Sequence, residues 1–411
     1  MATTVSEFVN QQRHGAMAQF GATGNGGIRR LALSAEDAAA RAALVEWAAE
    51  RGFTAWADEI GNLYVRRDGR QPDAAAVLTG SHLDSQPAGG NFDGVFGVLA
   101  GLEALEALED AGVETKRPIE LVVWTNEEGC RFEPGTMGSA TFAGAETLAD
   151  MLAVRDHDGA TVAEAVQQTL ALVPRVARRA MSSVQPRAYV EAHIEQGPRL
   201  EREGSAIGVV SGVQGARWYR VDIDGREGHA GTVPMSGRRD AFRAAVNIAG
   251  AMHRLFDDAS DRTRFTIGRC DVSPGAPSTI PGHVTFSIDF RHPERDVLIE
   301  KGRQIAAVCR AHASGCDVRV EELMGTPPTR FDADLIDLIE TTATRLGLST
   351  LRLMSGADHD ARLLAQVCPA AMIFIACKDG LSHNEAEHAS LADMANGARV
   401  LADVLLALAN A

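Results

Sequence analysis

Apolar and polar positions along the chain follow two periods. Short apolar runs of strand length alternate with longer segments in which apolar residues recur at helical spacing. Residues 74–80 form one such run, and residues 94–110 follow it with apolar side chains at 95, 98, 99, 102, 105 and 108. That spacing places the apolar side chains on one face of a helix. The pattern predicts a buried strand followed by a crossover helix.

Three later segments contain further predicted strands of this kind: 118–128, 187–197 and 369–383. Helical patterns separate them. Strands joined by helices are typical of βαβ units, which build a mostly parallel sheet flanked by helices. We therefore predict an α/β fold, in which binding sites gather beyond the carboxyl ends of the strands.

The section 211–323 has a different order of elements. Its pattern predicts strand, helix, two strands, helix and strand, which is the order of a ferredoxin-like α+β sandwich. A chain of 411 residues also exceeds what one ordinary core holds. We predict a larger discontinuous domain, residues 1–210 and 326–411, with a smaller domain of residues 211–325 inserted into it.

The composition is that of an ordinary globular protein, with 45% apolar and 23% charged residues. No segment has the apolar length of a signal peptide or of a membrane span. The net charge of -15 opposes binding to nucleic acid and to anionic lipid. The six cysteines lack CxxC spacing and fit neither a disulfide framework nor a structural zinc site. We expect a cytoplasmic protein with no nucleic-acid or membrane partner.

Histidines and carboxylates follow the predicted strands near the points where those strands end. Singly, each has an ordinary explanation as a surface or core histidine, a solvated turn or a turn cap. Parallel strands end at the same edge of a sheet, however, so these side chains would gather there, and a loop aspartate before the 94–110 helix can fold back over that edge. The convergence favours a binding site. The residues are His82, Asp93, Glu127, Glu128, His193 and His383.

These side chains are ligands for first-row divalent metal ions. A carboxylate between two histidines can bridge a pair of ions, which lie roughly 3.5 to 4 Å apart and hold a hydroxide between them. Of the adjacent pair Glu127 and Glu128, one carboxylate can bind metal while the other serves as general base. Asp84, two residues after His82, is placed to accept the second imidazole N–H.

Seven motifs occur in order along nearly the whole chain: GSHLDSQPAGGNFDGVFGVLAGLEAL, TNEEGCRF, EAHIEQGP, GHAGTVPM, IPGHVTFSIDFRHP, SGADHDA and GLSHNEAEH. Together they resemble the hydantoinase/carbamoylase family of zinc-dependent amidases. That family belongs to the aminoacylase and carboxypeptidase clan of dinuclear metallohydrolases. The resemblance implies two divalent ions, zinc first, with manganese, cobalt or nickel also compatible with the ligands.

The resemblance also implies a role for each matching residue. The implied metal ligands are His82, Asp93, Glu128, His193 and His383, with Asp93 as the bridge. Glu127 matches the general base. The implied substrate contacts are Gln196, His229 and Arg291. His229 would stabilise the oxyanion and Arg291 would bind a substrate carboxylate. In this family the inserted domain is lid and dimer contact, so a homodimer is expected.

One departure from the family concerns substrate choice. The family commonly has Asn-x-Ile-Pro-Gly where this chain has STIPG, which puts Ser278 at the position of a substrate-contacting asparagine. We expect the chain to remove the carbamoyl group from an N-carbamoyl-L-amino acid, a small ureido compound with a carboxylate. The alternatives in the family are allantoate amidohydrolase and β-ureidopropionase. Beyond it stand a clan aminoacylase or peptidase and, in another class, a non-catalytic binding protein.

Overall fold

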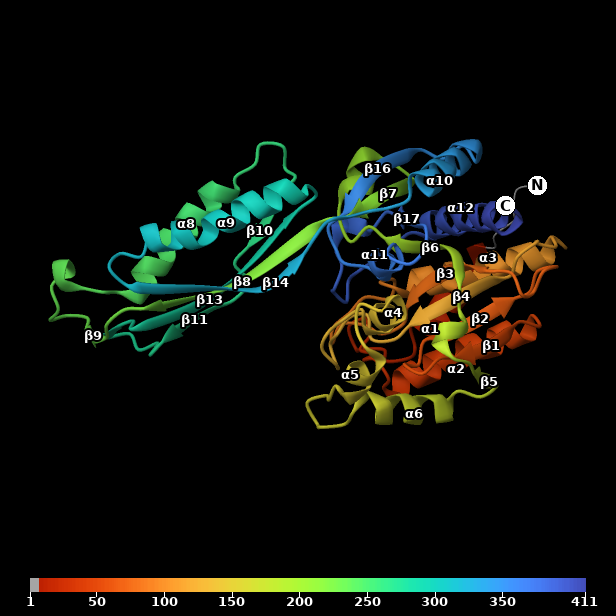
Figure 1. The fold of residues 1–411 in the computed structure, drawn as a ribbon, viewed down its shortest axis with the longest axis horizontal. Helices are drawn as coiled ribbons and strands as arrows, with labels where there is room; N and C mark the ends of the chain where they lie inside the picture. The colour runs from red at the N-terminus through yellow and green to blue at the C-terminus, as the bar shows by residue number, and fades with distance from the viewer. Residues whose placement is uncertain (1–6) are drawn as a thin grey trace. The chain divides into compact units, whose positions relative to one another are not determined.

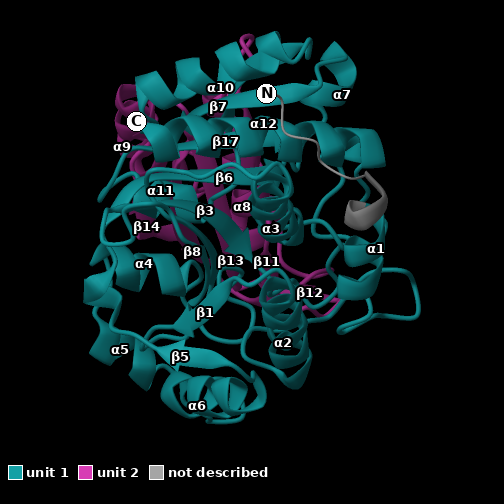
Figure 2. Ribbon diagram, turned by 90° about the vertical axis from the view of Figure 1, so that its right-hand side faces the viewer, with its two compact units in different colours: residues 1–212, 330–411 teal, residues 213–329 magenta. Residues whose placement is uncertain are grey.

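The structure is a computed structural model that describes residues 7–411. It divides into two compact units. Unit 1 holds the chain up to Gly212 together with Arg330–Ala411, and unit 2 is Val213–Thr329 (Figure 2). The boundaries between the units fall after residues 212 and 329. The sequence predicted them after residues 210 and 325. Each unit has its own sheet and its own core, so each is described by itself.

Unit 1 is built on a ten-stranded sheet (Figure 1). The strands run in the order β15-β7-β17-β6-β3-β4-β2-β1-β5, and β16 pairs with β7. Their bounds are β1 (Thr54–Ala57), β2 (Leu63–Arg67), β3 (Ala76–His82), β4 (Ile119–Trp124), β5 (Val176–Arg178), β6 (Pro186–Ile194), β7 (Ile207–Val213), β15 (Thr329–Arg330), β16 (Thr350–Ser355) and β17 (Ala370–Ile375).

The four central strands, β17, β6, β3 and β4, lie side by side and run parallel to one another. Every residue of β3, β4 and β17 is buried. A strand covered on both faces is apolar on both, which is why these runs show no alternation. Antiparallel pairs occur on either side, where β2 pairs with β1 and β4 and β7 pairs with β17. The predicted mostly parallel sheet is confirmed.

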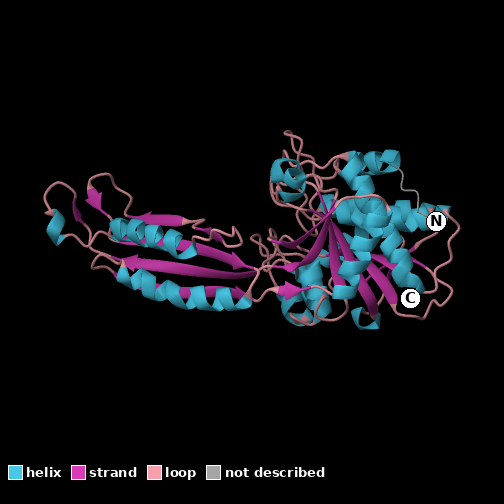
Figure 3. Ribbon diagram, turned by 90° about the horizontal axis from the view of Figure 1, so that it is seen from above, coloured by secondary structure: helices cyan, strands magenta, loops and turns pink. Residues whose placement is uncertain are grey.

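Helices flank this sheet (Figure 3). The helix predicted from the spacing at 95–108 is α3, which packs on β3 and β6 and against the last helix, α12. A second pair, α4 and α11, packs together and on β4, β6 and β17. The bounds are α1 (Glu7–Met17), α2 (Ala35–Glu50), α3 (Val95–Asp110), α4 (Met137–Ala143), α5 (Leu148–Ala153), α6 (Val162–Leu172), η1 (Met181–Ser183), α7 (Arg199–Glu203), α10 (Ala333–Arg345), α11 (Asp360–Leu364), η3 (Lys378–Gly380) and α12 (Leu391–Asn410).

Unit 2 is a five-stranded antiparallel sheet with two helices, α8 and α9, packed on it. The strand order is β10-β13-β8-β14, β11 also pairs with β13, and β9 and β12 form a separate small sheet. Of the two strands predicted between the helices, the first, residues 264–273, is divided into β10 and β11, which both pair with β13. The bounds are β8 (Gly215–Asp224), β9 (Gly228–His229), η2 (Met235–Gly237), α8 (Ala241–Phe256), β10 (Arg264–Thr266), β11 (Cys270–Ser273), β12 (Thr279–Ile280), β13 (His283–His292), α9 (Arg295–Ala311) and β14 (Asp317–Thr326).

Where the chain leaves and re-enters each unit, its two segments lie side by side. In unit 1, the backbone N–H of Phe331 donates to the carbonyl of Ser211 at 3.1 Å. In unit 2, Ala216 of β8 is paired with Thr326 of β14. Among the described residues, no helix combines the length and apolar character needed to cross a membrane.

Candidate metal centre and active site

The four central strands of unit 1 end at one edge, and the predicted ligands lie at or beyond those ends. His82 is the last residue of β3 rather than beyond it, and His193 is the second-last residue of β6. Glu127 and Glu128 follow the end of β4. His383 is farther from its strand than expected, because β17 ends at residue 375 and the turn η3 comes between them.

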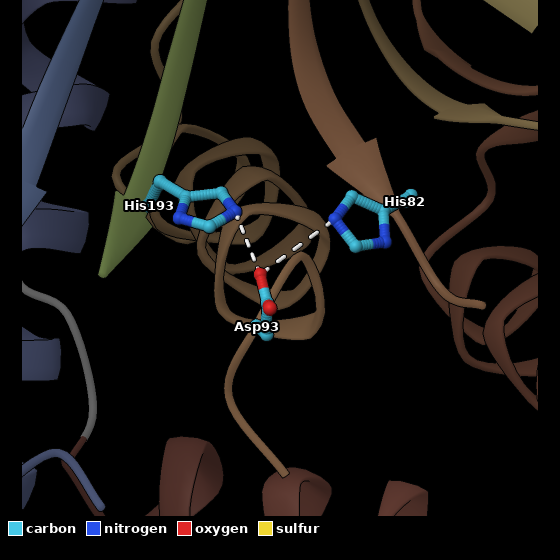
Figure 4. A group of neighbouring side chains, drawn as sticks. All are labelled: His82, Asp93 and His193. Atoms are coloured by element: carbon cyan, nitrogen blue, oxygen red, sulfur yellow. Dashed lines mark ion pairs between the residues drawn. The ribbon is translucent and has the colours of Figure 1, made fainter. Parts of the chain in front are cut away.

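The carboxylate of Asp93 lies between the rings of His82 and His193 (Figure 4). Its Oδ1 is 3.2 Å from Nε2 of His193 and 3.8 Å from Nε2 of His82. Its Oδ2 is 3.2 Å from Nε2 of His383, and that nitrogen is 3.6 Å from Oε2 of Glu128. The two oxygens of one carboxylate therefore belong to two groups of potential metal ligands, His82–Asp93–His193 and Asp93–Glu128–His383.

The two groups differ in burial. His82, Asp93 and His193 are each at most 6% exposed. The side chain of His383, in contrast, is 49% exposed. The second group therefore has an open side through which a small molecule can reach it.

The hydrogen bonds of the two buried imidazoles set which nitrogen faces Asp93. Nδ1 of His82 bonds to the backbone carbonyl of Asp84, and Nδ1 of His193 to that of Ile194, each at 2.9 Å. A carbonyl only accepts, so each Nδ1 carries a hydrogen, and Nε2 is the nitrogen left to bind a metal ion beside Asp93. This is the arrangement that metal-binding histidines use.

Asp84 acts differently from the expectation. Its carbonyl, not its carboxylate, accepts the imidazole hydrogen of His82. The carboxylate instead accepts the backbone N–H groups of Glu127 (3.2 Å) and Glu128 (3.1 Å). Asp84 thereby fixes the main chain of the adjacent glutamates.

A glycine allows helix α3 to begin directly against the His82 ring. Gly94, the residue before α3, has φ 66°, and a Cβ there would lie 2.4 to 2.5 Å from ring atoms of His82. Any other residue would displace the imidazole or the start of the helix. The glycine after Asp93 is therefore part of the site geometry.

The pKa shifts show that the site favours positive charge between its carboxylates. Burial alone would raise the pKa of Asp93, but the histidines around it hold that pKa well below its usual value. Burial lowers and Asp93 raises the pKa of His193, which comes to about 9. The pKa of Glu127 is raised well above its usual value by burial and by Asp360 and Glu128, and that of Glu128 is raised to about 7 by burial and by Asp93. Divalent cations suit such a donor set.

Two amide side chains hold the carboxylates in place. Nε2 of Gln196 donates to Oδ2 of Asp93 at 3.0 Å and to the hydroxyl of Ser382 at 3.2 Å. The sequence suggested Gln196 as a substrate contact, and the structure places it against Asp93. Nε2 of Gln86 donates to Oε2 of Glu128 at 2.6 Å. Gln86 was not anticipated, since nothing in a loop sequence indicates which amide points inward.

A buried histidine and two buried carboxylates behind the site were also not anticipated. The ring of His359 lies edge-on to that of His193, with ring centroids 4.6 Å apart. Glu191, two residues before His193, accepts the hydroxyl of Ser81 at 2.7 Å, and Asp360 is fully buried next to His359. The available signal was a glutamate inside an otherwise apolar strand, which burial makes costly unless it has partners.

In unit 2, two of the predicted substrate contacts lie together. His229 of β9 is paired with Thr279 of β12, and the N–H of Ala230 donates to the carbonyl of Ser278 at 2.8 Å. The N–H of Gly231 donates to Nδ1 of His229 at 3.1 Å. That bond leaves the ring hydrogen on Nε2, so the exposed edge of His229 is a hydrogen-bond donor.

Arg291 lies apart from this pair. It is the second-last residue of β13 and is paired with Ala216, whereas His229 lies beyond the opposite end of the same strand, which starts at His283. Eight residues of extended strand span about 26 Å. The guanidinium already forms a fork on Asp289, with Nε–Oδ1 at 3.1 Å and Nη2–Oδ2 at 2.8 Å.

Comparisons with known proteins show the family of the chain. Residues 78–407 match the peptidase family M20/M25/M40. An N-carbamoyl-L-amino-acid amidohydrolase of Rhizobium meliloti is 37% identical over 95% of this chain and 93% of its own length. The chain belongs to the M20/M25/M40 peptidase family. The allantoate amidohydrolase of Bacillus subtilis is 33% identical over 96% of this chain and 95% of its own.

A solved structure places the chain more closely within the M20 family. The hydantoinase/carbamoylase family amidase of Burkholderia multivorans superposes with a TM-score of 0.93 at 42% identity, covering 100% of this chain and 99% of that one. The recognised resemblance is therefore confirmed. The chain is a metal-dependent M20 amidohydrolase of the carbamoyl-amino acid and allantoate type, a hydrolase of C–N bonds.

Proposed function

We propose that the protein removes the carbamoyl group from an N-carbamoyl-L-amino acid. Water adds to the ureido carbonyl, the bond from that carbon to the α-nitrogen breaks, and the released carbamic acid decomposes to carbon dioxide and ammonia. The observation that carries the proposal is the position of Asp93, whose two oxygens face two separate groups of ligands.

We propose that these groups hold two divalent ions, zinc in the first place. The residues fit the ions because two imidazoles present Nε2 to Oδ1 of Asp93 and a third presents Nε2 to Oδ2. Bound there, the ions would polarise the carbonyl and lower the pKa of a water between them. The ligands would be His82, Asp93, Glu128, His193 and His383.

Glu127 is the proposed general base. Its Oε2 is 3.6 Å from Nε2 of His82, so it lies at the site without belonging to either ligand group. Its raised pKa, caused first by burial and then by nearby carboxylates, suits a group that takes a proton from water and delivers it to the departing nitrogen. Asp84 keeps its main chain in place during both transfers.

Unit 2 is proposed as the lid that supplies the substrate contacts. The Nε2–H of His229 is oriented to donate to the developing oxyanion, and Arg291 offers guanidinium hydrogens to the substrate carboxylate. Ser278, which lies close to His229, would contact the substrate group beside the scissile bond. Gln196 would contact substrate while holding Asp93.

We further propose a homodimer. In one chain, Arg291 lies near the end of β13, whereas His229 lies beyond its start. This strand is far longer than a carbamoyl amino acid. One small substrate therefore cannot touch both residues of the same unit 2. A second copy that supplies one of the two solves this problem.

Allantoate and 3-ureidopropionate are the alternative substrates, since both join a ureido group to a carboxylate. Ammonia release from the three substrate classes, measured on the same enzyme preparation, tests the assignment. The N-carbamoyl-L-amino acids are expected to give the highest kcat/KM. A higher value for either alternative overturns the choice of substrate.

Metal removal tests the mechanism separately. Exhaustive chelation is expected to abolish turnover of every substrate, and added zinc, manganese, cobalt or nickel to restore it. Metal content by mass spectrometry should be two ions per chain. Turnover that persists with no metal left in the protein contradicts the mechanism.

A further inference from the structure

One buried carboxylate ties the loop of His383 to the loop of Asp93. Glu387, four residues after His383, is 4% exposed. Its Oε1 accepts the backbone N–H groups of Phe92 at 2.9 Å and Asp93 at 3.0 Å. Its Oε2 accepts the hydroxyl of Ser382 at 2.7 Å. A single side chain thus joins both segments that approach the second ligand group.

The fit around this carboxylate is close. A Cβ at Gly90 would lie 2.2 Å from Oε1 and 2.3 Å from the Cβ of Glu387. Only glycine leaves room for the glutamate at that position. Gly90 is therefore needed for the close approach of Glu387 to the Asp93 loop.

The backbone at His383 gives a reason for such an anchor. Its φ is 53°, in the left-handed region that is uncommon for residues other than glycine. Contacts from the surroundings must maintain such a conformation. Glu387 also closes a turn, because its N–H donates to the carbonyl of Asn384 at 3.0 Å. The turn and the carboxylate together fix where the His383 ring points.

We infer that Glu387 is a positioning residue that sets the separation of Asp93 and His383, and thereby the affinity of the ion held by Asp93, Glu128 and His383. The inference rests on the proposed two-ion site. It predicts an asymmetry. Both groups share Asp93, but the other group takes its histidines, His82 and His193, from β3 and β6 of the central sheet, whereas His383 lies in a loop.

The chain provides a matched control two residues away. Glu385 lies in the same loop, and its carboxylate accepts hydrogen bonds from Thr23 and Asn25 rather than from the Asp93 loop. Replacing it removes a charge from the same loop but leaves the link to Asp93 intact. Its variant therefore separates loss of the link from general loosening of the loop.

The experiment is a zinc titration of metal-free full-length protein against a chromophoric chelator. His383→Ala first identifies which of the two affinities belongs to the second group. Glu387→Ala is expected to weaken that same affinity about tenfold to a hundredfold, as loss of partners behind metal ligands does. The other affinity should change little, Glu387→Gln should fall between, and Glu385→Ala should match the unchanged protein.

Melting of the metal-free proteins provides the structural readout. If Glu387→Ala does not fold, the titration of Glu387→Gln decides. Unchanged affinities in a folded Glu387 variant, or an equal loss of both ions, overturn the inference while the two-ion site stands. If the unchanged protein binds fewer than two ions, the proposed function fails first, at a step that precedes any variant.

Discussion

The ligand cluster of unit 1 and the substrate contacts proposed in unit 2 are built in opposite ways. In unit 1, His82, Asp93 and His193 are buried and linked to the main chain or to one another. In unit 2, His229 and Ser278 are exposed. His229 lies in the small sheet of β9 and β12, and Ser278 directly precedes β12. Groups that must hold charge in fixed positions are packed, and groups that must meet a substrate are left open.

This difference predicts that substitutions in the two regions have different effects on catalysis. Changes in the packed cluster should affect the chemical step or the ions for every substrate alike. Changes in the exposed set should affect one substrate more than another, because these residues are proposed to contact the parts in which substrates differ.

Replacing Glu127 by Gln should have the largest effect. The carboxamide cannot accept a proton, so kcat should fall about 10²- to 10⁴-fold for all three substrate classes, with metal content unchanged. Steady-state kinetics and metal analysis measure both. Glu120→Gln, a buried carboxylate on β4 that pairs with Arg66, is the control. Loss of metal in Glu127→Gln would mean that the roles of Glu127 and Glu128 are exchanged.

Arg291→Lys should come next. Lysine keeps the charge but loses the planar fork, so KM for carboxylate substrates should rise about tenfold to a hundredfold. Carboxamide analogues of the same substrates should change little. Arg220→Lys, on the neighbouring strand β8, is the control. Equal effects on acid and amide would remove Arg291 from carboxylate recognition.

Ser278→Asn should sharpen the comparison within the exposed set. The longer amide adds or misplaces one hydrogen bond, worth about 1 to 2 kcal/mol. Ratios of kcat/KM between the three substrate classes should therefore shift several-fold, while metal content stays the same. Unchanged ratios would place Ser278 outside the pocket and move the search for specificity elsewhere in unit 2.

His14→Phe should have the smallest effect on catalysis, because it changes only the dependence of stability on pH. His14 stacks on Phe92 beside Asp93, and burial lowers its pKa from 6.5 to about 4. Between these values the unfolded chain binds a proton that the folded chain does not, so the free energy of unfolding falls as pH decreases from about 6.5 to 4, by up to about 3 kcal/mol.

Thermal melting across this pH range should show a steeper loss for the unchanged protein than for His14→Phe, which keeps the stacking. The carboxylates of the metal cluster titrate in both proteins, so the difference between the two curves isolates His14. Parallel curves would show that His14 takes up its proton in the folded state.

The sequence predicted the parts of unit 1 that have a clear apolar pattern. Fully apolar runs indicated buried parallel strands, and topology then brought His82, His193 and the Glu127–Glu128 pair to one edge. The path of the long loop to His383 could not be predicted, because it depends on η3 and on contacts such as Glu387 with the Asp93 backbone.

The interior partners were missed for a related reason. A sequence shows which residues can donate or accept hydrogen bonds, but not which atom is used. Asp84 therefore appeared as a carboxylate partner of His82, while its carbonyl makes that bond and its carboxylate holds the glutamates. His359 was overlooked because its partner, the ring of His193, is 166 positions earlier in the chain.

The adjacent chain crossings described for both units have a consequence for how such a gene can change. Ser211 and Phe331 are hydrogen-bonded neighbours in unit 1, and Ala216 and Thr326 are paired in unit 2. The 117 residues of Val213–Thr329 therefore begin and end almost at one point. Because the two ends of this segment are close in space, it can be exchanged, lengthened or lost with little disturbance of the central strands that carry the ligands. If unit 2 supplies the substrate contacts as proposed, substrate range can evolve with this one segment while the ligands of unit 1 stay the same.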